Sequence, residues 1–331
     1  MNWNLIGHEP AVRLLKEHIK QGNLRQAYLL TGPQGIGKRT LALRIVQAVN
    51  CQQPAGDGEP CYQCRSCQQI ERMQHPDLSI IQAEQVAGSL KVDQIRDLQR
   101  SLSLAPYEAN YRAGILLRFE EASAGAANAL LKTLEEPPAR VILILTAENS
   151  ELLLPTIVSR CEVIRLRPAS IEQAAQGLQQ HWGIAPEQAQ LLAHISGGRV
   201  GYALQLYQSP EQMEQRQIWL DDLHRLLTAG RVERFAYASR LSSDKNYKET
   251  LQAVLPVWIS LWRDVLLVAA GASTPVTNLD RRDEIEAAAG RLGIEGARCA
   301  IQALERTLHL LSRNVNARLS LEVLMLDLPV L

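Results

Sequence analysis

The fold of this chain is decided by the stretch YLLTGPQGIGKRTLALR, which runs from Tyr28 to Arg44. An apolar run at its start predicts a buried strand, and the apolar spacing at its end is typical of a helix. Glycines and a lysine between the two form a loop that points backbone N–H groups at a phosphate. The candidate phosphate-binding residues are Gly32, Gly35, Ile36, Gly37, Lys38, Arg39 and Thr40.

One position of this loop departs from the P-loop pattern. The residue after the lysine is normally Ser or Thr, whose hydroxyl binds Mg²⁺. Here that residue is Arg39, and Thr40 comes one place late. The stretch therefore predicts a phosphate cradle without its metal ligand. A glycine-rich turn with no ligand is the alternative, and the strand–loop–helix context argues against it.

The bulk composition narrows the class of protein. A length of 331 residues favours two or three domains, and 46% hydrophobic residues provide a core. The net charge of +0 argues against a general polyanion-binding protein. The first residues, MNWNLIGHEP, lack the pattern of a signal peptide. The most apolar stretch, residues 254–270, contains Pro256, Arg263 and Asp264, so we expect a core helix and a cytoplasmic protein without a membrane partner.

Four cysteines follow the P-loop helix and predict a metal site. Cys51, Cys61, Cys64 and Cys67 are separated by nine, two and two residues. Two-residue gaps let neighbouring sulfurs converge on one ion, and four thiolates suit a closed tetrahedral Zn²⁺ site with a structural role. An iron–sulfur cluster is the alternative, although the C-x₃-C-P continuation of ferredoxins is absent.

Apolar runs near residues 27–30, 78–81, 113–117, 141–146 and 163–166 alternate with helical patterns. This alternation predicts a parallel sheet with helices on both faces. Everything after about residue 170 has a helical period, with a Ser209–Pro210 linker. We expect an α/β domain over residues 1–168 with a zinc module inserted at 51–67, a small helical domain over 169–208, and an all-α domain over 209–331.

The strand expected at 113–117 departs from the pattern of a hydrolysing P-loop ATPase. In such an enzyme this strand ends in Asp and Glu, which bind Mg²⁺ and orient the attacking water. Here the corresponding residues are Leu117 and Arg118, and Glu120 and Glu121 fall about three residues too late.

The motifs GPQGIGKRT, the four cysteines, AANALLKTLEEPP and PTIVSRC, in this order and spacing, resemble the bacterial clamp-loader family of AAA+ proteins. The motifs cover about residues 1–210, and the resemblance implies a P-loop AAA+ domain, a helical lid and a helical collar. In hydrolysing members the lid helix carries an arginine. Here Gly201 takes its place, or Arg199 if the alignment slips by two. Arg160, between Ser159 and Cys161, is retained, and this combination resembles the delta-prime branch of the family.

The resemblance implies a subunit of the DNA polymerase III holoenzyme. Such a hetero-oligomer, with delta and tau/gamma subunits, loads the sliding clamp onto primed DNA. Arg160, with Ser159 beside it, would act as an arginine finger on ATP in a neighbouring subunit. The chain itself would bind ATP or ADP without hydrolysis, or neither, and would have no independent ATPase activity.

Three alternatives stay open. A lone arginine is more often part of a surface ion pair. A hydrolysing tau/gamma-type ATPase is the second reading of the chain, against which Leu117 and Arg118 argue. A stand-alone zinc or DNA-binding module is the third, and the neutral net charge argues against it.

Overall fold

The computed structural model of the chain describes residues 3–56, 58–83, 88–243, 246–313 and 315–330. By its internal contacts the chain forms two compact units. The first comprises Met1–Gly177 and Arg199–Tyr202, and the second comprises Leu178–Gly198 and Ala203–Leu331. The three-domain division expected from the sequence stays a prediction.

The first unit is built on a parallel sheet of five strands in the order β2-β3-β4-β1-β5. All four strand pairs are parallel, so the carboxyl ends of the strands share one edge and the amino ends share the other. The strands are β1 (Ala27–Thr31), β2 (Leu78–Ile81), β3 (Arg112–Leu116), β4 (Val141–Ala147) and β5 (Glu162–Arg165). All five were predicted, to within about two residues.

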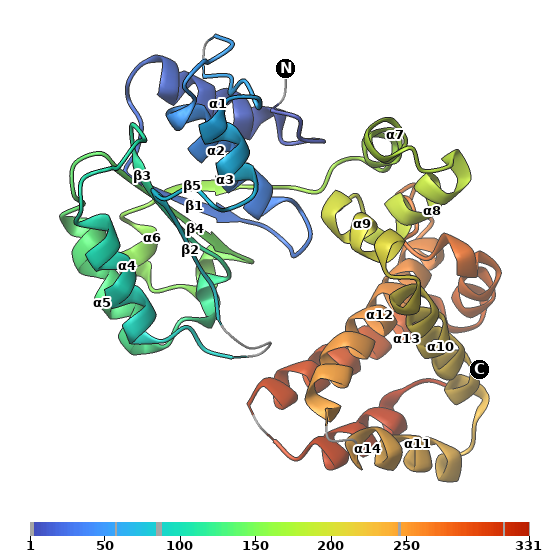
Figure 1. Cartoon of the computed structure of the whole chain (residues 1–331). Coiled ribbons are helices and arrows are strands. Elements are labelled where there is room, and N and C mark those ends of the chain that lie inside the picture. The colour runs from blue at the N-terminus through green and yellow to red at the C-terminus, as the bar shows by residue number, and fades with distance from the viewer. Residues whose placement is uncertain (1–2, 57, 84–87, 244–245, 314, 331) are drawn as a thin grey trace. The chain divides into compact units, whose positions relative to one another are not determined.

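Helices cover both faces of this sheet, as Figure 1 shows. On one face lie α1 (Glu9–Lys20), α2 (Lys38–Asn50) and α3 (Arg65–Glu71), and on the other lie α4 (Val92–Leu102), α5 (Ala124–Glu135) and α6 (Pro155–Val158). The strands serve both faces by alternation, because successive side chains of a strand point to opposite sides. Tyr28 and Leu30 belong to the first core, whereas Ala27 and Leu29 belong to the second.

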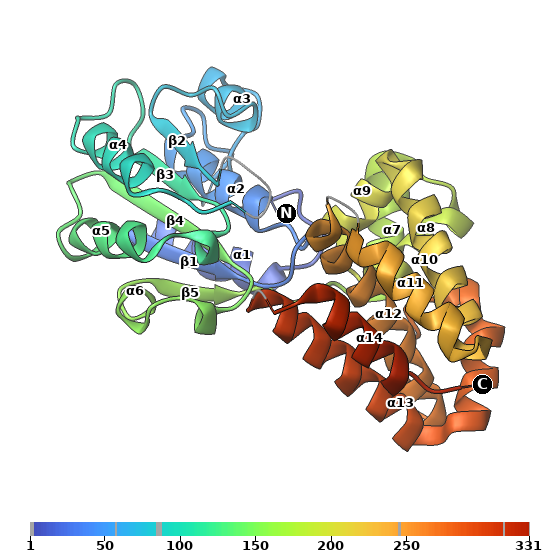
Figure 2. The same ribbon diagram turned by 90° about the horizontal axis from the view of Figure 1, so that it is seen from below.

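The second unit is helical. Helices of the chain from residue 171 onward are α7 (Ile171–Trp182), α8 (Pro186–Ser196), α9 (Val200–Gln208), α10 (Pro210–Thr228), α11 (Arg231–Ser243), α12 (Tyr247–Ala269), α13 (Arg282–Ser312) and α14 (Ala317–Asp327). Within this unit α12, α13 and α14 lie side by side (Figure 2). The expected fold class, α/β followed by all-α, is confirmed.

Helix α12 is the centre of the second unit's core. By length and composition alone it could cross a membrane. However, Val254, Trp258 and Trp262 are fully buried among apolar side chains of the neighbouring helices. Asp264, also fully buried, accepts hydrogen bonds from the backbone N–H groups of Thr277 and Asn278. A buried carboxylate with such partners is typical of a protein core, so α12 is a core helix, as the sequence predicted.

Candidate functional site

The predicted P-loop connects the carboxyl end of β1 to the first residue of α2, Lys38. Gly32, Gly35 and Gly37 have φ angles of 150°, 75° and 106°, which side-chain-bearing residues rarely adopt. Gly37 is also the N-cap residue of α2, so the helix begins with unsatisfied N–H groups that face the loop. This is the strand–loop–helix geometry from which a phosphate cradle is made.

Lys38 is turned back onto this loop. Its Nζ donates to the carbonyl oxygen of Gly32 and, at 3.2 Å, to that of Pro33. Burial lowers the pKa of Lys38, and the carboxylates of Glu148 and Glu120 oppose this shift. The ammonium group that would meet a phosphate is thus hydrogen-bonded to the loop itself.

Residues 199–202 lie directly on the P-loop. The backbone N–H of Tyr202 donates to the Gly35 carbonyl oxygen at 3.2 Å. A Cβ atom at Gly201 would come within 2.7 Å of that same oxygen, so this contact requires glycine. Arg199 stacks over the Tyr202 ring at 4.6 Å, and burial lowers its pKa. Gly201 and Arg199, the two candidates for the lid arginine's position, therefore both lie beside the loop.

The positions that would bind Mg²⁺ carry no oxygen ligand. The Arg39 side chain is exposed and reaches Met73 Sδ. Leu117 is buried, and Arg118 has a φ of 51° and pairs with Glu121 at 3.3 Å. Carboxylates are present near the P-loop lysine, because Glu148 and Glu120 both act electrostatically on the pKa of Lys38, and Glu120 accepts a hydrogen bond from the Glu148 backbone. They come from other positions than those of the hydrolysing pattern.

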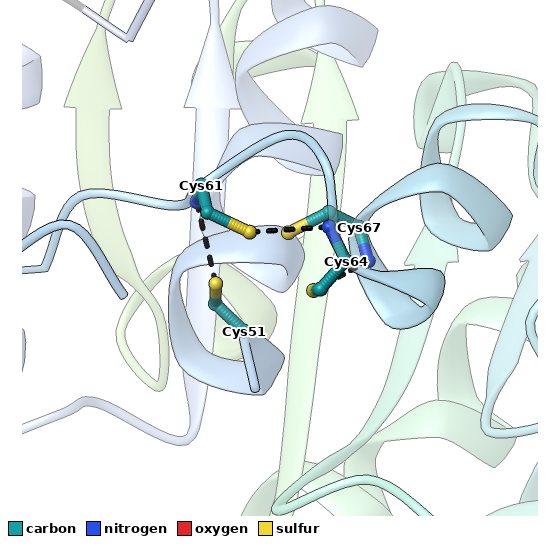
Figure 3. Close-up of side chains that lie close together, drawn as sticks. All are labelled: Cys51, Cys61, Cys64 and Cys67. Carbon is teal, nitrogen blue, oxygen red and sulfur yellow. Dashed lines mark hydrogen bonds between the residues drawn. The ribbon is translucent and has the colours of Figure 1, made fainter. Parts of the chain in front are cut away.

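The four predicted metal ligands converge. Figure 3 shows the cysteine side chains gathered between the end of α2 and the start of α3. Their sulfur atoms all lie within 4.8 Å of one another, so the set could hold a metal ion. Backbone N–H groups of Cys61, Cys64 and Cys67 each donate to a cluster sulfur, at 3.2–3.5 Å. Such N–H groups favour the thiolate form that metal binding requires.

The pKa values of the thiols fit this arrangement. Burial alone would raise the pKa of Cys61, but hydrogen bonds from the backbone of Cys64 and Gln63 outweigh it and lower the value to about 6. Burial raises the pKa of Cys51 and of Cys67. Sulfurs that cannot all be ionised together without a cation form a donor set suited to a thiophilic metal.

Helix α2 carries the cysteine cluster. Gln47, itself buried, donates to the Cys67 carbonyl oxygen at 2.8 Å and to Glu71 at 2.9 Å. Arg44 pairs with Glu71 and lies 5.1 Å from the centre of the Tyr62 ring. The cysteine cluster is thus anchored on the helix that begins at the P-loop.

Arg160 lies at the opposite, amino edge of the sheet, between α6 and β5. Its Nη2 pairs with Glu135 Oε1 at 2.7 Å, and its Nη1 donates to the Thr156 carbonyl oxygen at 2.8 Å. Ser159 Oγ lies 3.5 Å from Nη1 and itself donates to Thr156. The arginine side chain keeps 35% of its surface exposed. Arg160 therefore does form the surface ion pair that was one of the alternatives, and its side chain also remains accessible from outside.

A cavity of about 270 Å³ opens beside this arginine. Ser159, Arg160 and Cys161 line it, together with Arg25 and Glu162. Burial raises the pKa of the Cys161 thiol to about 12, so this sulfur is a neutral wall of the cavity rather than a nucleophile.

The sequence reasoning missed the side chains that hold these residues. Glu135 lies in a motif singled out for its resemblance, but nothing in the local pattern pairs it with Arg160. Gln47 sits on the buried face of a helix, where an amide signals an unseen polar partner. For the contact between Gly35 and Gly201, the sequence contained one indication: a glycine at position 201, where the family's pattern has an arginine.

Two protein-family models match this chain, one over its first part and one over its last part. A family model described as DNA polymerase III, delta subunit, matches residues 7–170, and one described as its C-terminal part matches residues 210–329. The chain belongs to the DNA polymerase III delta-subunit family. It is 34% identical over 205 residues to DNA polymerase III subunit delta' of Bacillus subtilis, and 40% over 177 residues to that of Pseudomonas aeruginosa.

Relatives that carry the names of other DNA polymerase III subunits also match. Subunit tau of Escherichia coli is 32% identical over 208 residues. These matches span 62%, 52% and 61% of this chain, and 60%, 52% and 32% of the respective relatives. A solved structure of a gamma subunit-related protein from Thermotoga maritima aligns over 95% of this chain and 97% of its own, with a TM-score of 0.46 at 18% identity.

Proposed function

We propose that this chain is a delta-prime-type clamp-loader subunit that supplies Arg160 to an ATP site of a neighbouring subunit and does not hydrolyse ATP itself. The observation that carries the proposal is a contrast within one domain. The Mg²⁺-binding positions hold Arg39, Leu117 and Arg118, whereas Arg160 is held in place and keeps 35% of its side chain exposed. The relatives named delta' support the subunit type.

Arg160 would act by electrostatics. As the γ-phosphoryl group of the neighbour's ATP is transferred to water, negative charge is spread over its oxygens. A guanidinium pre-placed beside them offsets that charge without reorganising solvent. Arginine fingers supplied in trans are worth roughly 10³–10⁵ in rate in other systems. Hydrolysis would then depend on assembly, because the finger arrives with this subunit.

The chain's own P-loop would contribute little to chemistry. Its glycines and the α2 terminus fit a phosphate, so weak ATP or ADP binding belongs to the proposal. Because the usual protein ligands of Mg²⁺ are absent, the site does not fit Mg²⁺-dependent hydrolysis. We expect negligible ATPase activity of the isolated chain. Turnover near one per second that is lost in Lys38→Ala would overturn this expectation, and would favour the hydrolysing tau/gamma type instead.

The cysteine module would hold one Zn²⁺ in a structural role. Four sulfurs, no histidine and no open position suit tetrahedral zinc. Cys51, Cys61, Cys64 and Cys67 would tie the chain after α2 to α3 and so support the helix that starts at the P-loop. Delta and tau/gamma subunits, the sliding clamp and primed DNA are the proposed partners, in the cytoplasm.

The test of the proposed function is reconstitution of the loader with Arg160→Ala. We expect normal assembly and slower clamp-stimulated ATP hydrolysis. Arg160→Lys should not restore the rate, because a point charge does not reproduce the planar fork of donors. Full hydrolysis and clamp-loading rates with Arg160→Ala would remove the proposed role.

A further inference from the structure

The guanidinium of Arg160 is held at two points that come from different helices. Glu135, the last residue of α5, pairs with Nη2 at 2.7 Å. The carbonyl oxygen of Thr156, in α6, accepts a hydrogen bond from Nη1 at 2.8 Å. Two contacts on separate nitrogens fix the plane of the group as well as its position. A free arginine side chain has many rotamers, and these two contacts already remove part of that freedom.

The position of Glu135 is electrostatically unfavourable for a carboxylate. It lies in the last turn of α5, next to the negative end of the helix dipole, where cations are preferred. The helix ends immediately afterwards, at Pro137 and Pro138. The positive charge of Arg160 offsets both the carboxylate and the helix terminus. Among the described residues the adjacent Glu136, equally exposed, makes no ion pair, so the contact belongs to one of two neighbouring glutamates.

The anchored guanidinium still has donors to offer. The group carries five N–H bonds, of which the two anchors use one on each Nη, and Ser159 Oγ lies 3.5 Å from Nη1. Within the part of the chain that the structure describes, Nε–H has no hydrogen-bond partner. With 35% of the side chain exposed, the unused N–H groups are open to an anionic oxygen from outside.

We propose that Glu135 is a positioning residue for Arg160. It holds the guanidinium in the orientation in which the free N–H groups face the phosphoryl oxygens of a neighbouring subunit. The inference rests on the proposed function of Arg160 and adds a second residue to it. Glu135 acts only through Arg160, so its loss lowers kcat for ATP and leaves the KM unchanged, as expected for an interaction made in the transition state.

The experiment uses the complete loader, reconstituted in turn with the wild-type chain, Arg160→Ala, Glu135→Ala, Glu135→Gln, Glu136→Ala and the double variant Arg160→Ala/Glu135→Ala. The readouts are kcat and KM of clamp- and DNA-stimulated hydrolysis. A misplacement of a catalytic group by about 1 Å can lower the rate up to about 10²-fold. Glu135→Ala is therefore expected to lower kcat by about half or more, on a logarithmic scale, of the decrease that Arg160→Ala causes. Glu135→Gln keeps an oxygen at the same reach and restores most of the rate. Glu136→Ala has the wild-type rate.

The outcomes separate this inference from the function on which it rests. Wild-type kinetics with Arg160→Ala would remove both. Slow hydrolysis with Arg160→Ala but wild-type kinetics with Glu135→Ala would keep the arginine finger and remove the positioning role. A double variant slower than Arg160→Ala, or a raised KM with Glu135→Ala, would show that Glu135 acts by another route and overturn the inference. A double variant equal to Arg160→Ala supports it.

Discussion

The two edges of the parallel sheet differ in what they offer to a partner. At the carboxyl edge the P-loop is occupied by its own chain, since Lys38 donates to the loop carbonyls and the Tyr202 N–H donates to Gly35. At the amino edge Arg160 is anchored by Glu135 and Thr156 but remains partly exposed. At the edge that carries the chemistry in P-loop ATPases, the carbonyl oxygens of Gly32, Pro33 and Gly35 thus accept hydrogen bonds from the chain itself, whereas the opposite edge presents a cation.

The largest expected effect comes from the module that supports the carboxyl edge. Cys64→Ser together with Cys67→Ser should abolish metal binding and lower the free energy of unfolding of the first unit by more than about 4 kcal/mol, because bound metal contributes directly to folding. Elemental analysis should give one zinc per wild-type chain. Hydrogen exchange should rise in α2 and α3 more than in α5 and α6. Cys299→Ser, at an exposed cysteine of α13 in the second unit, is the control. Iron in the wild type, or metal retained by the double variant, would contradict this.

The amino edge is pinned by a buried ion pair. Arg112 at the start of β3 donates to Asp77 at 2.8 Å, and the Asp77 carboxylate also accepts three backbone N–H groups. Burial alone would raise the pKa of Asp77, but these donors hold it at about 2. Asp77→Asn should lower the free energy of unfolding by about 3 kcal/mol at pH 7, because it leaves Arg112 buried and unpaired.

The same pair predicts a pH dependence. The folded-state pKa of Asp77 is depressed, so its stabilisation is complete above the unfolded value near 3.9 and is lost as pH falls toward 2. The gap between wild type and Asp77→Asn should therefore be constant from pH 7 to about 5 and shrink below about 4. Urea unfolding at several pH values measures it. A gap that widens in acid would contradict the assignment.

A smaller effect tests the internal contact of the P-loop. Alanine normally stabilises a helix relative to glycine, and Gly290→Ala in α13, where an added Cβ has nothing within 4 Å, should gain about 0.5–1 kcal/mol. Gly201→Ala would place its Cβ 2.7 Å from the Gly35 carbonyl oxygen and should instead lose about 1–2 kcal/mol. Equal gains in thermal unfolding for both variants would mean that residues 199–202 do not rest on the loop.

The smallest expected effect is the contribution of Arg160 to stability. Its partner Glu135 is half exposed, and ion pairs of this kind are worth about 0–1 kcal/mol. Arg160→Ala should therefore lower the free energy of unfolding by less than about 1 kcal/mol, measured by urea unfolding. A loss of several kcal/mol would make Arg160 a structural residue.

Much of this molecule could be predicted from its sequence. The apolar runs located all five strands, because a buried parallel strand needs side chains that are apolar on both faces. The spacing of the four cysteines predicted their convergence, since short gaps leave the sulfurs few other arrangements. Sequence reasoning did not find the pairing of Glu135 with Arg160, or the contact of Gly35 with Gly201. Both join residues far apart in the chain, and their geometry is fixed only once the sheet has brought their elements together.

The most direct measurement places the two edges side by side in one assay. Loaders reconstituted with Lys38→Ala or with Arg160→Ala are compared for clamp-stimulated ATP hydrolysis and for clamp loading. The proposed function predicts near wild-type rates for Lys38→Ala, because the ammonium group of Lys38 is hydrogen-bonded to its own loop in the wild type. It predicts slowed hydrolysis with intact assembly for Arg160→Ala. Slowed hydrolysis with Lys38→Ala and full rates with Arg160→Ala would contradict it, and would make the P-loop the working edge of this chain.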